Sequence, residues 1–88
     1  MYTVELKNAA QKFIAAQSKK IQRQLIGRIE SLAADPHPAG SKLLRADERI
    51  YSLRSGGYRI LYQVENDRLA VLIIKIGHRR EIYERLNL

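Results

Sequence analysis

Residues 49–76 alternate between strand-like runs and tight turns, and this pattern limits the possible fold more than any other feature of the chain. Tyr58 to Glu65 is rich in aromatic and β-branched residues, and Leu69 to Ile76 is almost continuously apolar. Ser55-Gly56-Gly57 and Asn66-Asp67 separate the runs with turn-forming residues. We therefore expect three short antiparallel strands, of which the apolar run is a central strand covered on both faces.

The N-terminal half adds one strand and two helices. Residues 2–6 alternate between apolar and polar side chains, as a half-buried strand does. Asn8 is placed to cap a short helix that runs to about Gln17, and Ser18 is placed to cap a longer one. Asp35-Pro36 ends the longer helix, because proline disfavours helix in the residue before it. The longer helix carries an apolar stripe formed by Ile21, Leu25, Ile29 and Leu32.

The order of these elements predicts the fold class. Residues 39–48, between the helices and the three strands, are expected to form a loop. We predict an α+β fold in which two N-terminal helices pack on one face of a mostly antiparallel four-stranded sheet, in the order β-α-α-β-β-β. A short C-terminal helix or tail follows Gly77. The chain shows no repeat or linker, so residues 1–88 are expected to form a single domain.

The charge balance indicates the class of partner. Sixteen Lys and Arg residues oppose nine Asp and Glu, which gives a net charge of +7. Such an excess attracts nucleic acid, and it also attracts an acidic protein. The chain has no cysteine, and its two histidines make no convincing metal site, so no metal or cofactor is expected. No signal peptide or membrane-spanning run is visible, so we expect a cytoplasmic protein without membrane contact.

Basic residues from separate strands are expected to meet at one end of the sheet. Side chains alternate along a strand, so Arg54 and Arg59 fall on the face away from the helices, on either side of the glycine turn. The last two strands run antiparallel, so Arg59 should lie near the segment 75–79. The residues gathered in this way are Arg54, Arg59, His78, Arg79 and Arg80.

The same face is expected to carry an apolar patch, provided that Asn66-Asp67 is a two-residue turn. The patch would consist of Leu61, Ala70, Leu72, Ile74 and Ile76. Small soluble proteins rarely leave such a patch in water, so either the C-terminal segment or a partner should cover it. A slip of one residue in the register would move these side chains to the other face.

Two motifs resemble the RelE branch of the RelE/ParE toxin superfamily. They are Leu53 to Val64, with the sequence LRSGGYRILYQV, and Gly77 to Tyr83, with the sequence GHRREIY. The N-terminal helices and the Asp35-Pro36 loop also fit the layout of the family, so the resemblance covers nearly the whole chain. It implies the toxin of a type II toxin–antitoxin system, an endoribonuclease that cleaves messenger RNA in the ribosomal A site without a metal and so inhibits translation.

The resemblance also implies partners and leaves two alternatives open. The partners are the ribosome, its messenger RNA and a RelB-like or similar antitoxin, through which alone the toxin contacts operator DNA. The first alternative is a ParE-like inhibitor of DNA gyrase, which has the same fold. The second is a catalytically degenerate toxin that retains only antitoxin binding and repression of its own promoter.

The resemblance assigns roles to individual residues. It marks Arg59 and Arg79 as phosphate-stabilising and proton-handling groups, and Tyr83 as the ring that stacks on or orients a base. The residue pattern alone fits Tyr83 equally well as an apolar anchor of a terminal helix. His78 is a candidate general base, because imidazole is the side chain best suited to exchange protons at physiological pH. The residues expected to bind RNA beside them are Arg54, Lys75 and Arg80.

The sequence departs from the family on the strand before the glycine turn. RelE proteins with well-defined cleavage activity carry lysines there, whereas this chain carries Ile50 and Ser52. The lysine-dependent role of general base is therefore unfilled. Arg54 lies close by in the sequence but is a poor base, because its guanidinium stays protonated.

Overall fold

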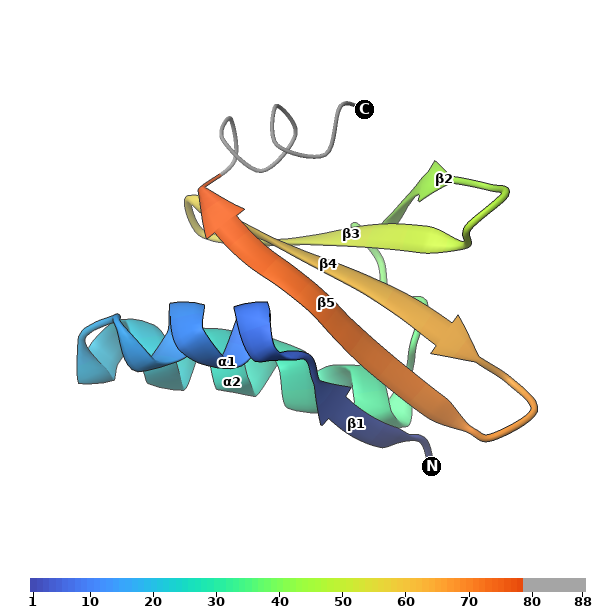
Figure 1. Ribbon diagram of the computed structural model, residues 1–88, viewed down its shortest axis with the longest axis horizontal. Helices are drawn as coiled ribbons and strands as arrows, with labels where there is room; N and C mark the ends of the chain where they lie inside the picture. Colours follow the sequence, from blue (N-terminus) through green and yellow to red (C-terminus); the bar gives the residue numbers. More distant parts are fainter. Residues whose placement is uncertain (79–88) are drawn as a thin grey trace.

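Two helices cover one face of a five-stranded sheet in the computed structural model, which describes residues 1–78 (Figure 1). The elements are β1 (Thr3–Leu6), α1 (Asn8–Ala15), α2 (Lys19–Ala34), β2 (Lys42–Arg45), β3 (Ile50–Ser55), β4 (Tyr58–Glu65) and β5 (Ala70–His78). The strand order is β1-β5-β4-β3-β2, and only the pair of β1 and β5 is parallel. The predicted α+β class, with two helices on a mostly antiparallel sheet, is confirmed.

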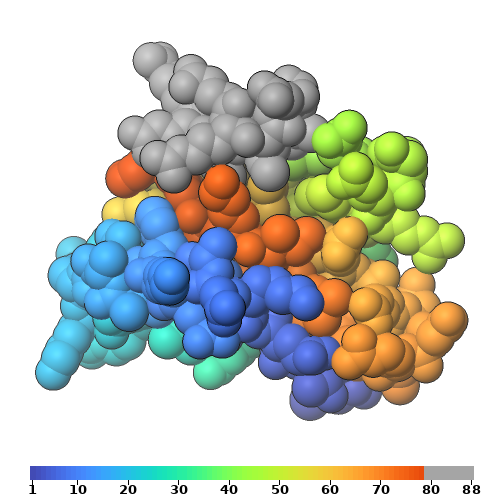
Figure 2. Space-filling model, viewed as in Figure 1, coloured from blue at the N-terminus to red at the C-terminus, as the bar shows by residue number. Residues whose placement is uncertain are grey.

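The sheet has one strand more than the sequence predicted. The segment 39–48, predicted to be a loop, contains β2, which pairs antiparallel with β3. Its four residues are too few to show a clear alternation, and the ladder shifts register between Leu43 and Arg45. This edge strand therefore forms because it pairs with β3, and its own sequence shows no strand-like pattern. Figure 2 shows β2, in yellow-green, at the opposite end of the molecule from α1.

The helix boundaries match the prediction more closely than the caps do. The Ser18 side chain accepts a hydrogen bond from the backbone N–H of Ile21 at 3.4 Å, so this predicted cap is confirmed. The predicted Asn8 cap is wrong, since Lys7 occupies the cap position and no side chain caps α1. As expected, α2 ends at Ala34, directly before Asp35-Pro36.

The main core lies between the helices and the sheet. The predicted stripe of α2 buries Leu25, Ile29 and Leu32, while Ile21 packs at its margin. Alternate side chains of β3 and β4 face the helices and lie in this core. They are the buried Leu53, Ile60, Tyr62 and Val64 and the partly buried Tyr51 and Tyr58.

A β-bulge in β5 changes which side chains share a face. Tyr62 pairs with Ile73 but Leu61 pairs with Lys75, so Ile74 is an extra residue between two rows. We call the sheet face opposite the helices the outer face. Leu61 and Ile74 belong to a second apolar cluster there, whereas Ile76 lies in the main core. The predicted outer position of Ile76 is therefore wrong, because parity reverses beyond the bulge.

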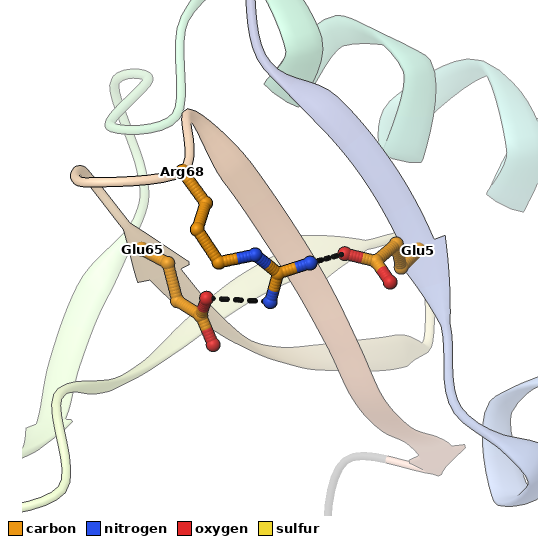
Figure 3. A network of polar contacts seen from close by, with 3 residues as sticks. All are labelled: Glu5, Glu65 and Arg68. Atoms are coloured by element: carbon orange, nitrogen blue, oxygen red, sulfur yellow. Dashed lines mark hydrogen bonds and ion pairs between the residues drawn. The ribbon is translucent and has the colours of Figure 1, made fainter.

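The turn between β4 and β5 also differs from the prediction. Glu65 pairs with Ala70, so the connection has four residues, Asn66 to Leu69, instead of two. The observed and the predicted connections both have an even number of residues, so side chains after the turn keep the same face. Ala70 and Leu72 therefore have their predicted outer position. Arg68 in this turn donates to the carboxylates of Glu65 at 2.8 Å and Glu5 at 3.0 Å, which links β1 to the turn (Figure 3).

Replacing Tyr62 with Phe should destabilise the protein by about 1–3 kcal/mol, because a buried acceptor loses its donor. The Tyr62 hydroxyl is buried and donates to the carbonyl of Pro36 at 2.8 Å. Urea unfolding at neutral pH would measure the loss. Tyr51→Phe is the matched control, since that ring stacks on Tyr62 at 5.6 Å and should change stability by less than about 0.5 kcal/mol. Equal stability of both variants and the wild type would contradict the expectation.

The same substitution should alter the response to alkaline pH. Burial raises the pKa of the Tyr62 hydroxyl, so folding favours its neutral form. This stabilisation is present below the pKa of an unfolded tyrosine, about 10, and is lost as pH rises through the raised folded value. Tyr62→Phe should therefore lose less stability than the wild type over that range.

Candidate nucleic-acid interface

Basic residues from three strands share the outer face beside the turn between β3 and β4. The register places two rows of partners across these strands, Arg54–Arg59–Gly77 and Ser52–Leu61–Lys75. Directly opposite residues of an antiparallel pair point to the same face and lie about 4.5–5.5 Å apart at Cβ. We call the group of Ser52, Arg54, Arg59 and Lys75 the turn-end site.

The glycine turn determines how the two arginines face each other. Ser55 pairs with Tyr58 and extends β3 by one residue into the predicted turn Ser55-Gly56-Gly57, which leaves Gly56 and Gly57 as a two-residue turn. Gly56 has a φ of +60°, and a Cβ built there would lie 2.6 Å from the Nε2 atom of Gln24. A side chain at this position would therefore strain the backbone, and the Gln24 side chain would have to move aside. The turn thereby places Arg54 directly opposite Arg59.

Two hydrogen bonds hold this turn against α2, and the sequence did not reveal them. The Arg28 guanidinium donates to the carbonyl of Arg54 at 3.1 Å, and the Gln24 amide donates to the Ser55 hydroxyl at 3.4 Å. Both side chains lie away from the apolar stripe, so their pattern suggests only a solvated helix face. They reach the turn only because α2 packs on the sheet beside it.

Arg59 is a buried cation with no acidic partner in the part of the chain that the structure describes. It is 7% exposed, and its Nη1 atom donates to the Ser52 hydroxyl at 3.5 Å. Its Nε atom is buried and has no hydrogen-bond partner among the described residues. Within residues 1–78, no carboxylate forms an ion pair with Arg59, Arg54 or Lys75. Because a guanidinium stays protonated, this arrangement favours an incoming anion, and phosphate oxygens fit its paired donors.

The other two cations of the site differ from Arg59 in their surroundings. Arg54 is exposed and stands directly opposite Arg59, an arrangement in which like charges repel. Lys75 is partly buried and lies on this face because of the bulge, since the simple alternation would have turned it toward the helices. An anion bound between the strands would relieve the repulsion.

His78 lies on the other side of the sheet. It pairs with Tyr58, which faces the helices, and its ring lies 5.0 Å from that of Tyr58 and 6.3 Å from that of Phe13. The structure therefore brings Arg54, Arg59 and Lys75 together but separates His78 from them. Arg79, Arg80 and Tyr83, the remaining residues predicted for the site, lie outside the described residues.

The positions of the family lysines are buried here. Ser52 is 0% exposed, and Ile50 is 8% exposed and packs with Leu61 in the second apolar cluster. Neither residue supplies a base, so the departure seen in the sequence applies to the folded site as well. In the described part of the chain, no cluster of three His, Asp or Glu is placed to hold a metal ion. No helix within residues 1–78 has the length and apolar character needed to cross a membrane.

Comparison with known proteins identifies the family. Residues 4–83 match the model of the ParE toxin of the type II toxin–antitoxin system parDE. Toxin RelG of Mycobacterium tuberculosis is 35% identical over 54 residues, which are 61% of this chain and 62% of RelG. A putative RelE-like toxin protein of Escherichia coli is 30% identical over 80 residues, which are 89% of this chain and 83% of that protein.

A solved structure shows the same architecture. One chain of the intact E. coli RelBE toxin–antitoxin complex matches with a TM-score of 0.76 and 27% identity, over 91% of this chain and 99% of that one. Fold, family model and relatives define the protein as a toxin of a type II toxin–antitoxin system. It belongs to the RelE/ParE superfamily.

Proposed function

We propose that this toxin is a ribosome-dependent, metal-independent endoribonuclease that cleaves messenger RNA and so inhibits translation. The observation that carries the proposal is Arg59, a buried guanidinium with an unpaired Nε atom, directly opposite Arg54. Unsatisfied buried donors are rare in native proteins and need an explanation. A phosphodiester bound at the turn-end site supplies one.

The proposed reaction uses the RNA's own 2′-hydroxyl as the nucleophile. The 2′-hydroxyl gives its proton to water as its oxygen bonds to phosphorus, the bond from phosphorus to the 5′-oxygen breaks, and that oxygen takes up a proton from water. The products are a 2′,3′-cyclic phosphate and a 5′-hydroxyl. Arg59 stabilises the charge that develops on the phosphoryl oxygens, while Arg54 and Lys75 bind flanking phosphates. Arg79 and Tyr83 keep the roles that the family resemblance gives them.

Positioning should contribute more to catalysis here than acid–base chemistry does. No lysine occupies positions 50 and 52, and His78 lies on the helix side of the sheet. The ribosome would hold the message in a reactive geometry, so the isolated chain is expected to be a weak nuclease. Because Arg59 is only 7% exposed, the proposal also requires that RNA binding uncovers it.

The proposed protein partner is a RelB-like antitoxin. The similar E. coli structure is a complex of RelE with RelB. The outer face carries the basic turn-end site, so an antitoxin segment with acidic residues would suit it. Operator DNA would be bound only through the antitoxin, and the ribosomal target would place the toxin in the cytoplasm.

A ParE-like inhibitor of DNA gyrase is the second candidate. The matching family model is that of the ParE toxin. Ile50 and Ser52 in place of the lysines favour a toxin that binds without cutting. The same fold would then present the basic face to a protein–DNA complex instead of to a message.

A cell-free translation extract separates these functions. We expect the full-length toxin to produce new message ends, mapped by primer extension, only when ribosomes are present. Arg79→Ala and Tyr83→Phe should weaken the cleavage if these residues have the proposed roles. An intact message together with a loss of DNA supercoiling would show that the toxin inhibits gyrase. No effect on either the message or supercoiling would indicate a degenerate toxin.

A further inference from the structure

A second basic groove lies on the helix side of the turn between β3 and β4. It is lined by Arg23, Gln24, Gly27 and Arg28 of α2 together with residues 54–56. Three of these residues are arginines, and none is acidic. Arg23 and Arg54 are exposed, while Arg28 is partly buried. The groove is therefore a second concentration of positive charge, and it lies on the helix side of the turn instead of on the outer face.

The arginines of this groove have donors available for an anion. None of the three forms an ion pair within residues 1–78. Arg28 uses one donor on the carbonyl of Arg54, and Arg54 uses its Nε on the carbonyl of Gly56 at 3.2 Å, whereas a guanidinium has five donors. Gly27 keeps the floor of the groove open, since a Cβ at that position would meet nothing within 4 Å. The residues that line the groove include three arginines and no carboxylate, which favours an anionic ligand such as a phosphate.

We propose that this groove binds a backbone phosphate of RNA that passes over the turn from the turn-end site. The inference rests on the proposed function, because it names a second contact for the same substrate class. Arg54 connects the two places, as it belongs to the turn-end site and also lines the groove. The phosphate belongs either to the message or to ribosomal RNA, and the contact positions the strand without reading its sequence.

The pair Gly27→Glu and Gly27→Gln tests the groove. The two variants add side chains of similar size and differ by one negative charge. Fluorescence anisotropy with a short labelled single-stranded RNA and sedimentation with small ribosomal subunits would measure binding by the full-length toxin. We expect Gly27→Glu to bind about fivefold to tenfold more weakly than Gly27→Gln at low salt, and the difference to shrink as salt rises.

A second pair controls for net charge. Arg23→Gln should lower the slope of log affinity against log salt by about 0.7 for single-stranded RNA, as expected for one lost phosphate contact. Lys20→Gln removes one charge from the same helix outside the groove and should leave that slope unchanged. Circular dichroism and urea midpoints of all four variants would show that the fold is intact.

The outcomes separate the two RNA sources and the two proposals. Weakened binding of the oligonucleotide would assign the groove to the message, and weakened binding of the ribosomal subunit alone would assign it to ribosomal RNA. Equal binding by both Gly27 variants to both probes would overturn the inference, as would an effect confined to antitoxin binding. Binding is measured without cleavage, so an inactive toxin with a charge-sensitive groove would refute only the proposed function.

Discussion

Replacing Arg59 with Met should make the toxin more stable and much less active. The guanidinium is 7% exposed. Among residues 1–78 its Nε atom has no hydrogen-bond partner, and its Nη1 atom makes a long bond of 3.5 Å to the Ser52 hydroxyl. Methionine has a similar length and no polar atom that requires a partner. Removing an unpaired buried charge in favour of an apolar side chain should raise the free energy of unfolding by about 1–3 kcal/mol.

Activity should change in the opposite direction. If Arg59 stabilises the phosphoryl oxygens in the transition state, its removal should lower the rate of message cleavage about 10²–10³-fold, the usual effect of losing one preorganised donor. Arg59→Lys retains the charge but not the paired donors, so its rate should lie between those of Arg59→Met and the wild type. The measurements are urea unfolding and primer extension in a translation extract.

Lys20→Met is the control for the loss of one positive charge. Lys20 is exposed on α2, away from the outer face, so the substitution should change stability by less than about 0.5 kcal/mol and leave cleavage unchanged. An Arg59→Met variant that is less stable than the wild type would show that the buried charge is well paired. An Arg59→Met variant that cleaves at the wild-type rate would show that Arg59 takes no part in the reaction. Opposite shifts in stability and activity are typical of residues kept for function.

The local sequence around the glycine turn contains most of the information about the turn-end site. Two glycines between two strand-like runs allow only a tight turn, and alternation then places Arg54 and Arg59 on one face. Both predictions are confirmed, because each depends only on residues that are neighbours along the chain.

The errors arose where a long-range partner decides the structure. The bulge at Ile74 is visible only in the pairing of β4 with β5, and it moved Lys75 to the outer face and Ile76 to the core. In the same way, β2 exists because β3 lies beside it. The bonds from Gln24 and Arg28 to the turn depend on the docking of α2. The alternation of apolar and polar residues within one segment cannot predict a bulge, an edge strand or a hydrogen bond that depends on a second segment.

The second large effect is expected from Leu25→Ala in α2, which should destabilise the fold by about 2–5 kcal/mol. Leu25 is 0% exposed and packs in the main core, so its removal leaves a cavity between the helix and the sheet. A small domain of this size has a stability of only about 5–15 kcal/mol, so a large share would be lost. Urea unfolding followed by far-UV circular dichroism would measure the change.

Ile26→Ala is the matched control, because the next residue of the same helix is 40% exposed. It loses a side chain of the same size, and alanine favours the helix, so we expect less than about 1 kcal/mol of destabilisation. The contrast has a consequence for the site. Leu25 adjoins Gln24, which bonds to the turn, so a loosened α2 should release the turn and weaken RNA binding even where Leu25→Ala stays folded. Equal effects of the two substitutions would mean that α2 does not pack on the sheet as described.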